Sequence, residues 1–168
     1  MRRADAPGLR PYLPADARNL AQLFRASVET LAAEDYDVDQ RAAWVAVADD
    51  ETAFAARLND ALTIVALLEG VIAGFAALRD NKTLDMLYVR PDCAGRGVGA
   101  ALLDALEKLA AGRGAKTISV DAADSARDFF LRQGYVPQSR NTLTVHGQWL
   151  GNTHMTKELA PAATGGPH

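Results

Sequence analysis

The sequence predicts an α/β protein: a three-layer α/β/α sandwich around a mixed, mostly antiparallel sheet of about seven strands. Segments with helical spacing of apolar residues alternate with apolar runs typical of strands. Tight-turn residues at Glu69-Gly70 and at Asp80-Asn81-Lys82 lie between such runs and predict antiparallel hairpins. One strand–helix–strand unit, from residue 84 to residue 121, adds a parallel pair to that sheet.

The N-terminal part predicts one short strand and three helices. Apolar residues recur at helical spacing up to Leu31, and Pro14 ahead of them suits a first helical turn. An acidic link, Glu34 to Asp39, follows this helix. The expected segments are a strand over Leu9–Leu13, the helix that Pro14 begins, and short helices over Gln40–Val47 and Thr52–Leu58.

The rest of the chain predicts six strands and two helices. Leucines on one face indicate an amphipathic helix that ends at Gly112, and Gly134 ends a second helix that contains two phenylalanines. The expected strands are Leu62–Leu68, Val71–Leu78, Leu84–Val89, Lys116–Asp121, Asn141–Val145 and Trp149–Lys157. The second helix is expected over Asp124–Gln133.

Composition places the chain among globular proteins and excludes several function classes. The 168 residues, 49% hydrophobic and 23% charged, predict one domain over residues 1–159 and a disordered tail over residues 160–168. The net charge of −3, without a basic cluster, argues against nucleic acid as a partner. No apolar stretch is long enough for a membrane span, and the lone Cys93 excludes an internal disulfide and a cysteine-based zinc site. We expect a cytoplasmic protein with no metal, and a homodimer stays open.

A glycine-rich turn follows the strand that ends at Val89. Gly95, Gly97 and Gly99 alternate just before the leucine-rich helix. Backbone N–H groups and the positive end of the helix dipole point the same way in such a turn, which is typical of a phosphate site. The ligand is therefore expected to carry phosphate groups.

A dinucleotide is the weaker of two interpretations of this turn. Gly95, Gly97 and Ala100 match the letters G-x-G-x-x-A, and Asp121 ends the next strand as an acidic residue does in that fold. However, five residues, Arg90 to Ala94, separate the strand from the first glycine, and a hairpin precedes the strand. An NAD(P)-dependent oxidoreductase is therefore the weaker alternative.

The second interpretation rests on two motifs. Val89-Arg90-Pro91-Asp92, followed by GRGVG and Ala-Leu-Leu, resembles motif A of the GNAT superfamily, the acyl-CoA-dependent N-acetyltransferases. The segment Ala126–Tyr135 (ARDFFLRQGY) looks like the next motif of that family, and the element order matches over Leu9 to Leu159. The resemblance implies the acyl-CoA N-acyltransferase fold, acetyl-CoA as cosubstrate, and direct transfer of acetyl to a primary amine of a small or peptide acceptor in a ternary complex.

The resemblance also implies where the cofactor binds. The amides of residues 95–100 would cradle the CoA pyrophosphate, and the pantetheine arm would enter a gap where the motif A strand splays from the following one. A backbone N–H near Leu87–Val89 would polarise the thioester carbonyl. The residues expected at the cofactor are Leu87, Tyr88, Val89, Gly95, Arg96, Gly97, Val98, Gly99, Ala100 and Phe130.

The attacking amine needs a proton acceptor. An alkylammonium with a pKa of ~10 loses its proton at a cost of about 4 kcal/mol at neutral pH. Asp85 is the expected catalytic carboxylate, because in a regular strand it shares a face with Leu87 and Val89, the face expected to meet the acceptor. A purely structural strand aspartate is an equally good interpretation.

The leaving thiolate lacks its usual proton donor. The family usually has tyrosine at the position of Phe130, so Tyr88, Tyr36 or water would protonate the sulfur. Ala94 and Ala123 also replace side chains common in the family. A non-catalytic acyl-CoA-binding or sensor module is therefore the main alternative function.

Three further residues are expected to have no catalytic part. His146 and His154 lack a third metal ligand, which favours structural roles. Cys93 lies next to the glycine-rich turn, but nothing in the sequence indicates a reactive thiol.

Overall fold

The computed structural model describes residues 6–161, which form a seven-stranded sheet in the order β1-β2-β3-β4-β5-β7-β6. Its strands are β1 (Gly8–Pro11), β2 (Leu62–Leu68), β3 (Val71–Arg79), β4 (Thr83–Val89), β5 (Thr117–Ala123), β6 (Val136–Val145) and β7 (Gln148–Glu158). Within this range, β4 and β5 are the one parallel pair, and all other neighbours are antiparallel. The predicted mixed α/β sheet is confirmed.

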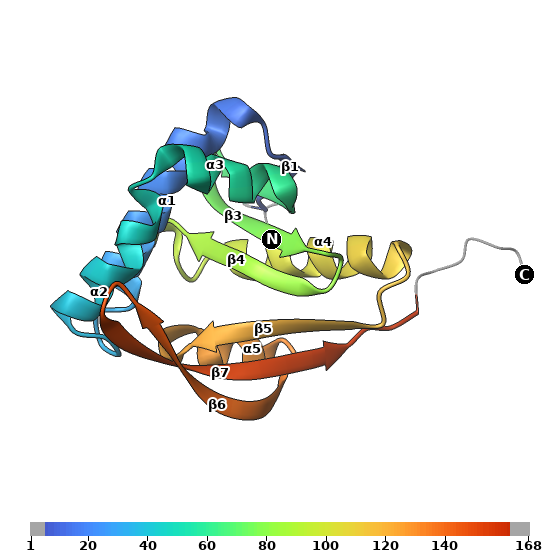
Figure 1. Ribbon diagram of the computed structural model, residues 1–168. Coiled ribbons are helices and arrows are strands. Elements are labelled where there is room, and N and C mark those ends of the chain that lie inside the picture. Colours follow the sequence, from blue (N-terminus) through green and yellow to red (C-terminus); the bar gives the residue numbers. More distant parts are fainter. Residues whose placement is uncertain (1–5, 162–168) are drawn as a thin grey trace, which may run out of the picture.

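Helices cover both faces of this sheet and complete the three predicted layers (Figure 1). They are α1 (Ala17–Leu31), α2 (Val38–Val45), α3 (Glu51–Asp60), α4 (Val98–Gly112) and α5 (Arg127–Arg132), with short 3-10 turns that include η4 (Pro91–Cys93) and η5 (Asp124–Ala126). Leucines of α4 and Phe130 of α5 pack against one face, with Ala76 and Leu78 of β3. The helices α1 and α3 pack on the other face, with Phe75 and Ala77.

Gly74 lets the start of α4 lie directly on β3. A Cβ at this position would lie 2.9 Å from both the Tyr88 carbonyl oxygen and Val98 Cγ1. Glycine removes that clash, so the first turn of α4 and the glycine-rich turn before it are held beside the end of β4.

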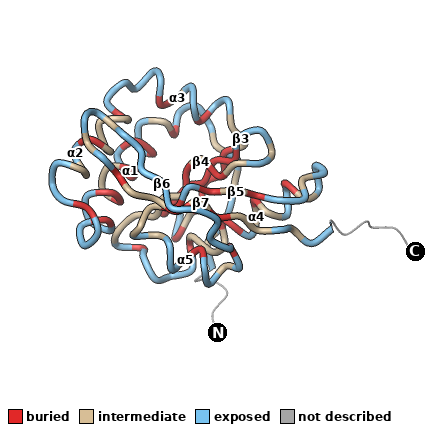
Figure 2. The backbone as a smooth tube through the Cα atoms, turned by 60° about the horizontal axis from the view of Figure 1, so that its bottom comes forward, coloured by how far each residue is buried: buried red, intermediate tan, exposed pale blue. Residues whose placement is uncertain are grey.

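The largest difference from the predicted elements is in β6. This strand begins at Val136, whereas the sequence predicted a start at Asn141. The strand lies at the sheet edge and is exposed along nearly its whole length (Figure 2), so it carries no apolar alternation. Most of the predicted tail, residues 162–168, lies outside the described residues. Between residues 6 and 161 there is no helix long and apolar enough to cross a membrane.

Candidate functional site

The sheet opens between β4 and β5, next to the glycine-rich turn. The two strands pair only at Thr83 with Ser119 and at Leu84 with Val120, and beyond these residues they splay apart. A cavity of about 590 Å³ fills the opening. The backbone of β4 from Asp85 onward therefore lacks a β5 partner and faces this space.

The glycine-rich turn presents a row of unpaired amides to the cavity. Within residues 6–161, the N–H groups of residues 95 to 100 have no hydrogen-bond acceptor, and no side chain caps α4. Gly95 and Gly97 adopt the left-handed conformation, with φ of +79° and +80°, and a Cβ on either would meet open space. Free amides at the start of a helix, beside a cavity, suit an anionic ligand.

The cavity brings together nearly all of the residues predicted to bind the cofactor. Nine of the ten line it: Leu87, Tyr88, Val89, Gly95, Gly97, Val98, Gly99, Ala100 and Phe130. Arg96 is exposed at the tip of the turn and is not part of the lining. Two further charged residues line the cavity: Asp121 of β5, which the sequence pointed to only in the dinucleotide interpretation, and Arg132 of α5, which it did not single out.

The predicted side-chain direction of Asp85 is wrong, because β4 contains a bulge. Leu78 of β3 pairs with Leu84 and Ala77 pairs with Met86, so Asp85 is the extra residue between the two pairs. The bulge shifts the alternation by one position. Leu87 and Val89 consequently pack on the α4 side, whereas Asp85 faces α3.

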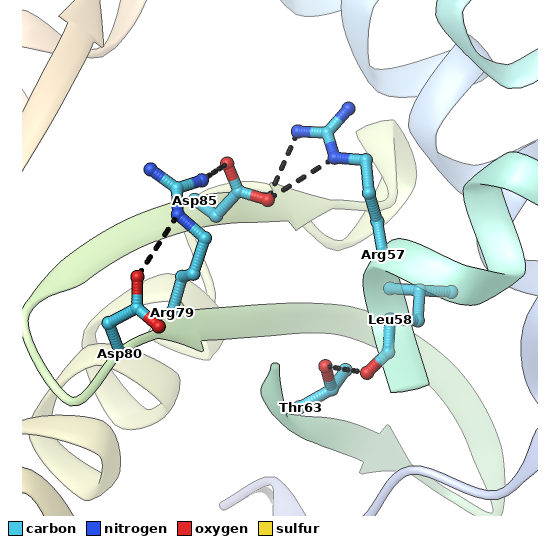
Figure 3. A network of polar contacts seen from close by, with 6 residues as sticks. All are labelled: Arg57, Leu58, Thr63, Arg79, Asp80 and Asp85. Carbon is cyan, nitrogen blue, oxygen red and sulfur yellow. Dashed lines mark hydrogen bonds and ion pairs between the residues drawn. The ribbon is translucent and has the colours of Figure 1, made fainter. Parts of the chain in front are cut away.

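Both oxygens of Asp85 are occupied (Figure 3). Arg79 Nη1 donates to Oδ1 at 2.7 Å, and Arg57 donates to Oδ2 from Nη2 at 3.1 Å and from Nε at 3.3 Å. Protonation of this carboxylate would weaken at least one ion pair. The contacts therefore favour a structural part for Asp85, holding the bulge where the strands begin to splay.

Tyr88 lies in an aromatic cluster on the α1 side of β4. Its ring centroid is 4.8 Å from that of Phe24 and 5.8 Å from that of Phe75. Burial raises the pKa of Tyr88 to about 12, although Trp44 and Arg57 oppose the shift. Since a thiol has a pKa of ~8.5, transfer of the Tyr88 proton to a thiolate would be uphill by about 5 kcal/mol.

Tyr36 joins the segment after α1 to the ends of two strands. Its hydroxyl donates to the Gly151 carbonyl at 2.6 Å and accepts from the Asp124 amide at 2.8 Å. Burial is the main reason why its pKa is raised. These bonds fix the wall of the site, while a proton-donor role for Tyr36 or Tyr88 stays a prediction.

Phe130 and Cys93 are buried beside the cavity. Phe130 packs edge-on between Phe129 and Tyr135, with centroid distances of 5.1 and 5.3 Å, and brings no ionisable group to the cavity. Burial raises the pKa of the Cys93 thiol, so this side chain is protonated at neutral pH.

Comparison with known proteins gives consistent results. The family described as "Acetyltransferase (GNAT) domain" matches residues 32–159. An uncharacterized N-acetyltransferase, YafP, from Escherichia coli K12 is 31% identical over 147 residues, which cover 88% of this chain and 93% of that protein. A crystal structure of a GCN5-related N-acetyltransferase from Rhodopseudomonas palustris has 55% identity and a TM-score of 0.90, covering 92% of this chain and 96% of that one. The fold also matches PaiA N-acetyltransferase from Thermoplasma acidophilum, solved in complex with coenzyme A, at 18% identity and a TM-score of 0.75, covering 91% of this chain and 99% of that one.

Proposed function

Because the chain belongs to the GNAT family of acetyltransferases, we propose that it moves an acetyl group from acetyl-CoA directly to a primary amine. The observation that carries the proposal is the row of unpaired amides from Gly95 to Ala100, which opens into the cavity between the splayed strands. The CoA complex of PaiA N-acetyltransferase supports the choice of cofactor.

The cofactor would bind in two parts. The pyrophosphate would accept hydrogen bonds from the amides at the start of α4, with Arg96 and Arg132 as cations near the phosphate groups. The pantetheine arm has two amides and would pair with the exposed backbone of β4, in place of the β5 strand that turns away. A free N–H of β4 near Leu87 would then lie beside the thioester oxygen.

The acetyl group would pass straight to the amine, without an acetyl-enzyme. A covalent route through Cys93 would need a thiolate, and burial raises the pKa of this thiol. The leaving thiolate can take its proton from water, since its conjugate thiol has a pKa of ~8.5. The absence of a hydroxyl on Phe130 therefore does not block the reaction.

Two measurements on the full chain test this function. Calorimetric titration should show saturable binding of CoA, and mixing with acetyl-CoA should release free thiol for at least one amine in a panel of spermidine, L-lysine, an aminoglycoside and a tripeptide with a free N-terminus. Tight CoA binding without thiol release for any amine would favour the sensor module. Thermal stabilisation by NADH but not by CoA would favour the oxidoreductase.

The ion pairs of Asp85 lead to a separate prediction. Asp85→Asn should lower the unfolding free energy by about 1–2 kcal/mol, because two guanidinium groups lose their shared partner. Turnover should fall by about tenfold or more as the bulge shifts. The shape of the pH–rate profile should not change, because both oxygens of Asp85 are already held by guanidinium groups.

Asp80→Asn is the matched control. Asp80 Oδ2 lies 3.9 Å from Arg79 Nε, and the Asp80 side chain is 85% exposed. The substitution therefore removes one charge from the same network without touching the bulge (Figure 3). Loss of the acidic limb of the pH–rate profile in a fully stable Asp85→Asn protein would restore Asp85 as the proton acceptor.

A further inference from the structure

Asp121 occupies the mouth of the opening between β4 and β5. The last paired residues are Leu84 and Val120, so Asp85 and Asp121 are the next residues on the two strands. Ile118, Val120 and Ala122 are buried on the α4 side, which turns Asp121 to the opposite face. Asp121 therefore shares the α1 side of the sheet with Asp85, and both residues line the cavity.

His154 holds Asp121 from the neighbouring strand. The two residues are directly opposite each other across β5 and β7, and His154 Nδ1 lies 2.8 Å from Asp121 Oδ1. An ionised carboxylate only accepts hydrogen bonds, so His154 Nδ1 is the donor of this bond. The side chains of Asp121 and His154 are 59% and 38% exposed, so both water and a substrate can reach them.

Three polar side chains on neighbouring segments, Asp85, Asp124 and Tyr36, already have partners. Asp85 binds Arg57 and Arg79, as described above. Asp124, just after β5, forms an ion pair with Arg140 of β6. The Tyr36 hydroxyl donates to the Gly151 carbonyl and accepts from the Asp124 amide. Asp121 differs from these groups because its Oδ2 has no hydrogen bond with any of residues 6–161.

We propose that Asp121 is the carboxylate that accepts the proton of the attacking amine, and that His154 is its positioning residue. This inference rests on the proposed acetyl transfer. The ammonium would first be held by Asp121. After its deprotonation, the amine nitrogen forms the C–N bond and becomes positively charged, which makes its two remaining protons far more acidic, and one of them is then lost.

The protons and bonds balance as follows. The nitrogen of R–NH3+ loses two protons in all, which pass by way of Asp121 to solvent. The C–S bond breaks as the C–N bond is completed, and the thiolate takes one proton from solvent. The sum is an N-acetylamine, free CoA thiol and one proton released.

Asp121→Asn is the test, with the amine of the panel that the wild type acetylates fastest. We expect kcat to fall by about 100-fold and the acidic limb of the pH–rate profile to disappear. The KM for acetyl-CoA and the midpoint of thermal unfolding should stay at their wild-type values. His154→Gln should give a smaller loss of kcat and move the same limb, because it removes only the positioning bond.

Asp104→Asn is the matched control, since it removes an exposed carboxylate of α4 that pairs with Lys108 and does not line the cavity. Asp104→Asn should keep the wild-type kcat and the wild-type pH–rate profile. If Asp121→Asn turns over as fast as the active wild type with the acidic limb intact, the role of Asp121 is overturned, and the proposed function stands. If the wild type acetylates no amine of the panel, the proposed function fails, and the role of Asp121 fails with it.

Discussion

Gly97→Val should weaken CoA binding by about 100-fold or more, because the loss of two charge-assisted hydrogen bonds costs about 3 kcal/mol. Gly97 is the residue just before α4, with φ of +80°, a conformation that a β-branched side chain does not tolerate. Relief of that strain rotates the neighbouring amides away from the pyrophosphate. Calorimetric titration with CoA measures the loss.

Gly70→Val separates this effect from backbone strain in general. Gly70 has φ of +79° and open space around its position, as Gly97 has, but it lies in the turn between β2 and β3 and does not line the cavity. This variant should lose stability and keep its CoA affinity. A folded Gly97→Val protein that binds CoA with wild-type affinity would show that the amides of this turn do not bind the cofactor.

Phe130→Ala should cost about 3–5 kcal/mol of unfolding free energy, the range for a large aromatic ring removed from a core. Phe130 is 3% exposed and packs against Phe129 and Tyr135 as well as lining the cavity. The same change widens the cavity where the thioester would lie. Chemical denaturation monitored by fluorescence measures the loss.

Phe130→Tyr is the matched substitution, because it keeps the ring and adds one hydroxyl. Stability should stay close to that of the wild type, and turnover should stay equal or rise as the sulfur gains a proton donor beside the cavity. A small loss of stability for Phe130→Ala would show that the ring is not part of the core.

Much of the fold follows from local sequence. Leu62 to Leu68 is apolar except for Thr63 and precedes a two-residue turn, and the strand has the predicted bounds. Gly112 ends α4, as predicted. These elements carry their signals within a few residues, in apolar spacing and in turn chemistry. The start of β6 was missed because an exposed edge strand has no such signal.

The site depends more on pairings that local sequence does not encode. The ligand cradle was predictable because its glycines lie within a few residues of one another in the chain. The direction of the Asp85 side chain was not predictable, because it depends on a bulge created by the register of β3 against β4. His154 reaches Asp121 only through the pairing of β5 with β7, across 33 residues of sequence. Contacts of this kind can be predicted only when the order and register of the strands are known.

The central claim is that the amides before α4 and the open edge of β4 hold coenzyme A. Amide chemical shifts of the 15N-labelled protein, followed during titration with CoA, test it most directly. We expect the largest saturable shifts at Gly95 to Ala100 and at Leu87 to Val89, and none there with NADH at the same concentration. Saturable CoA binding that leaves both segments unshifted would contradict the claim.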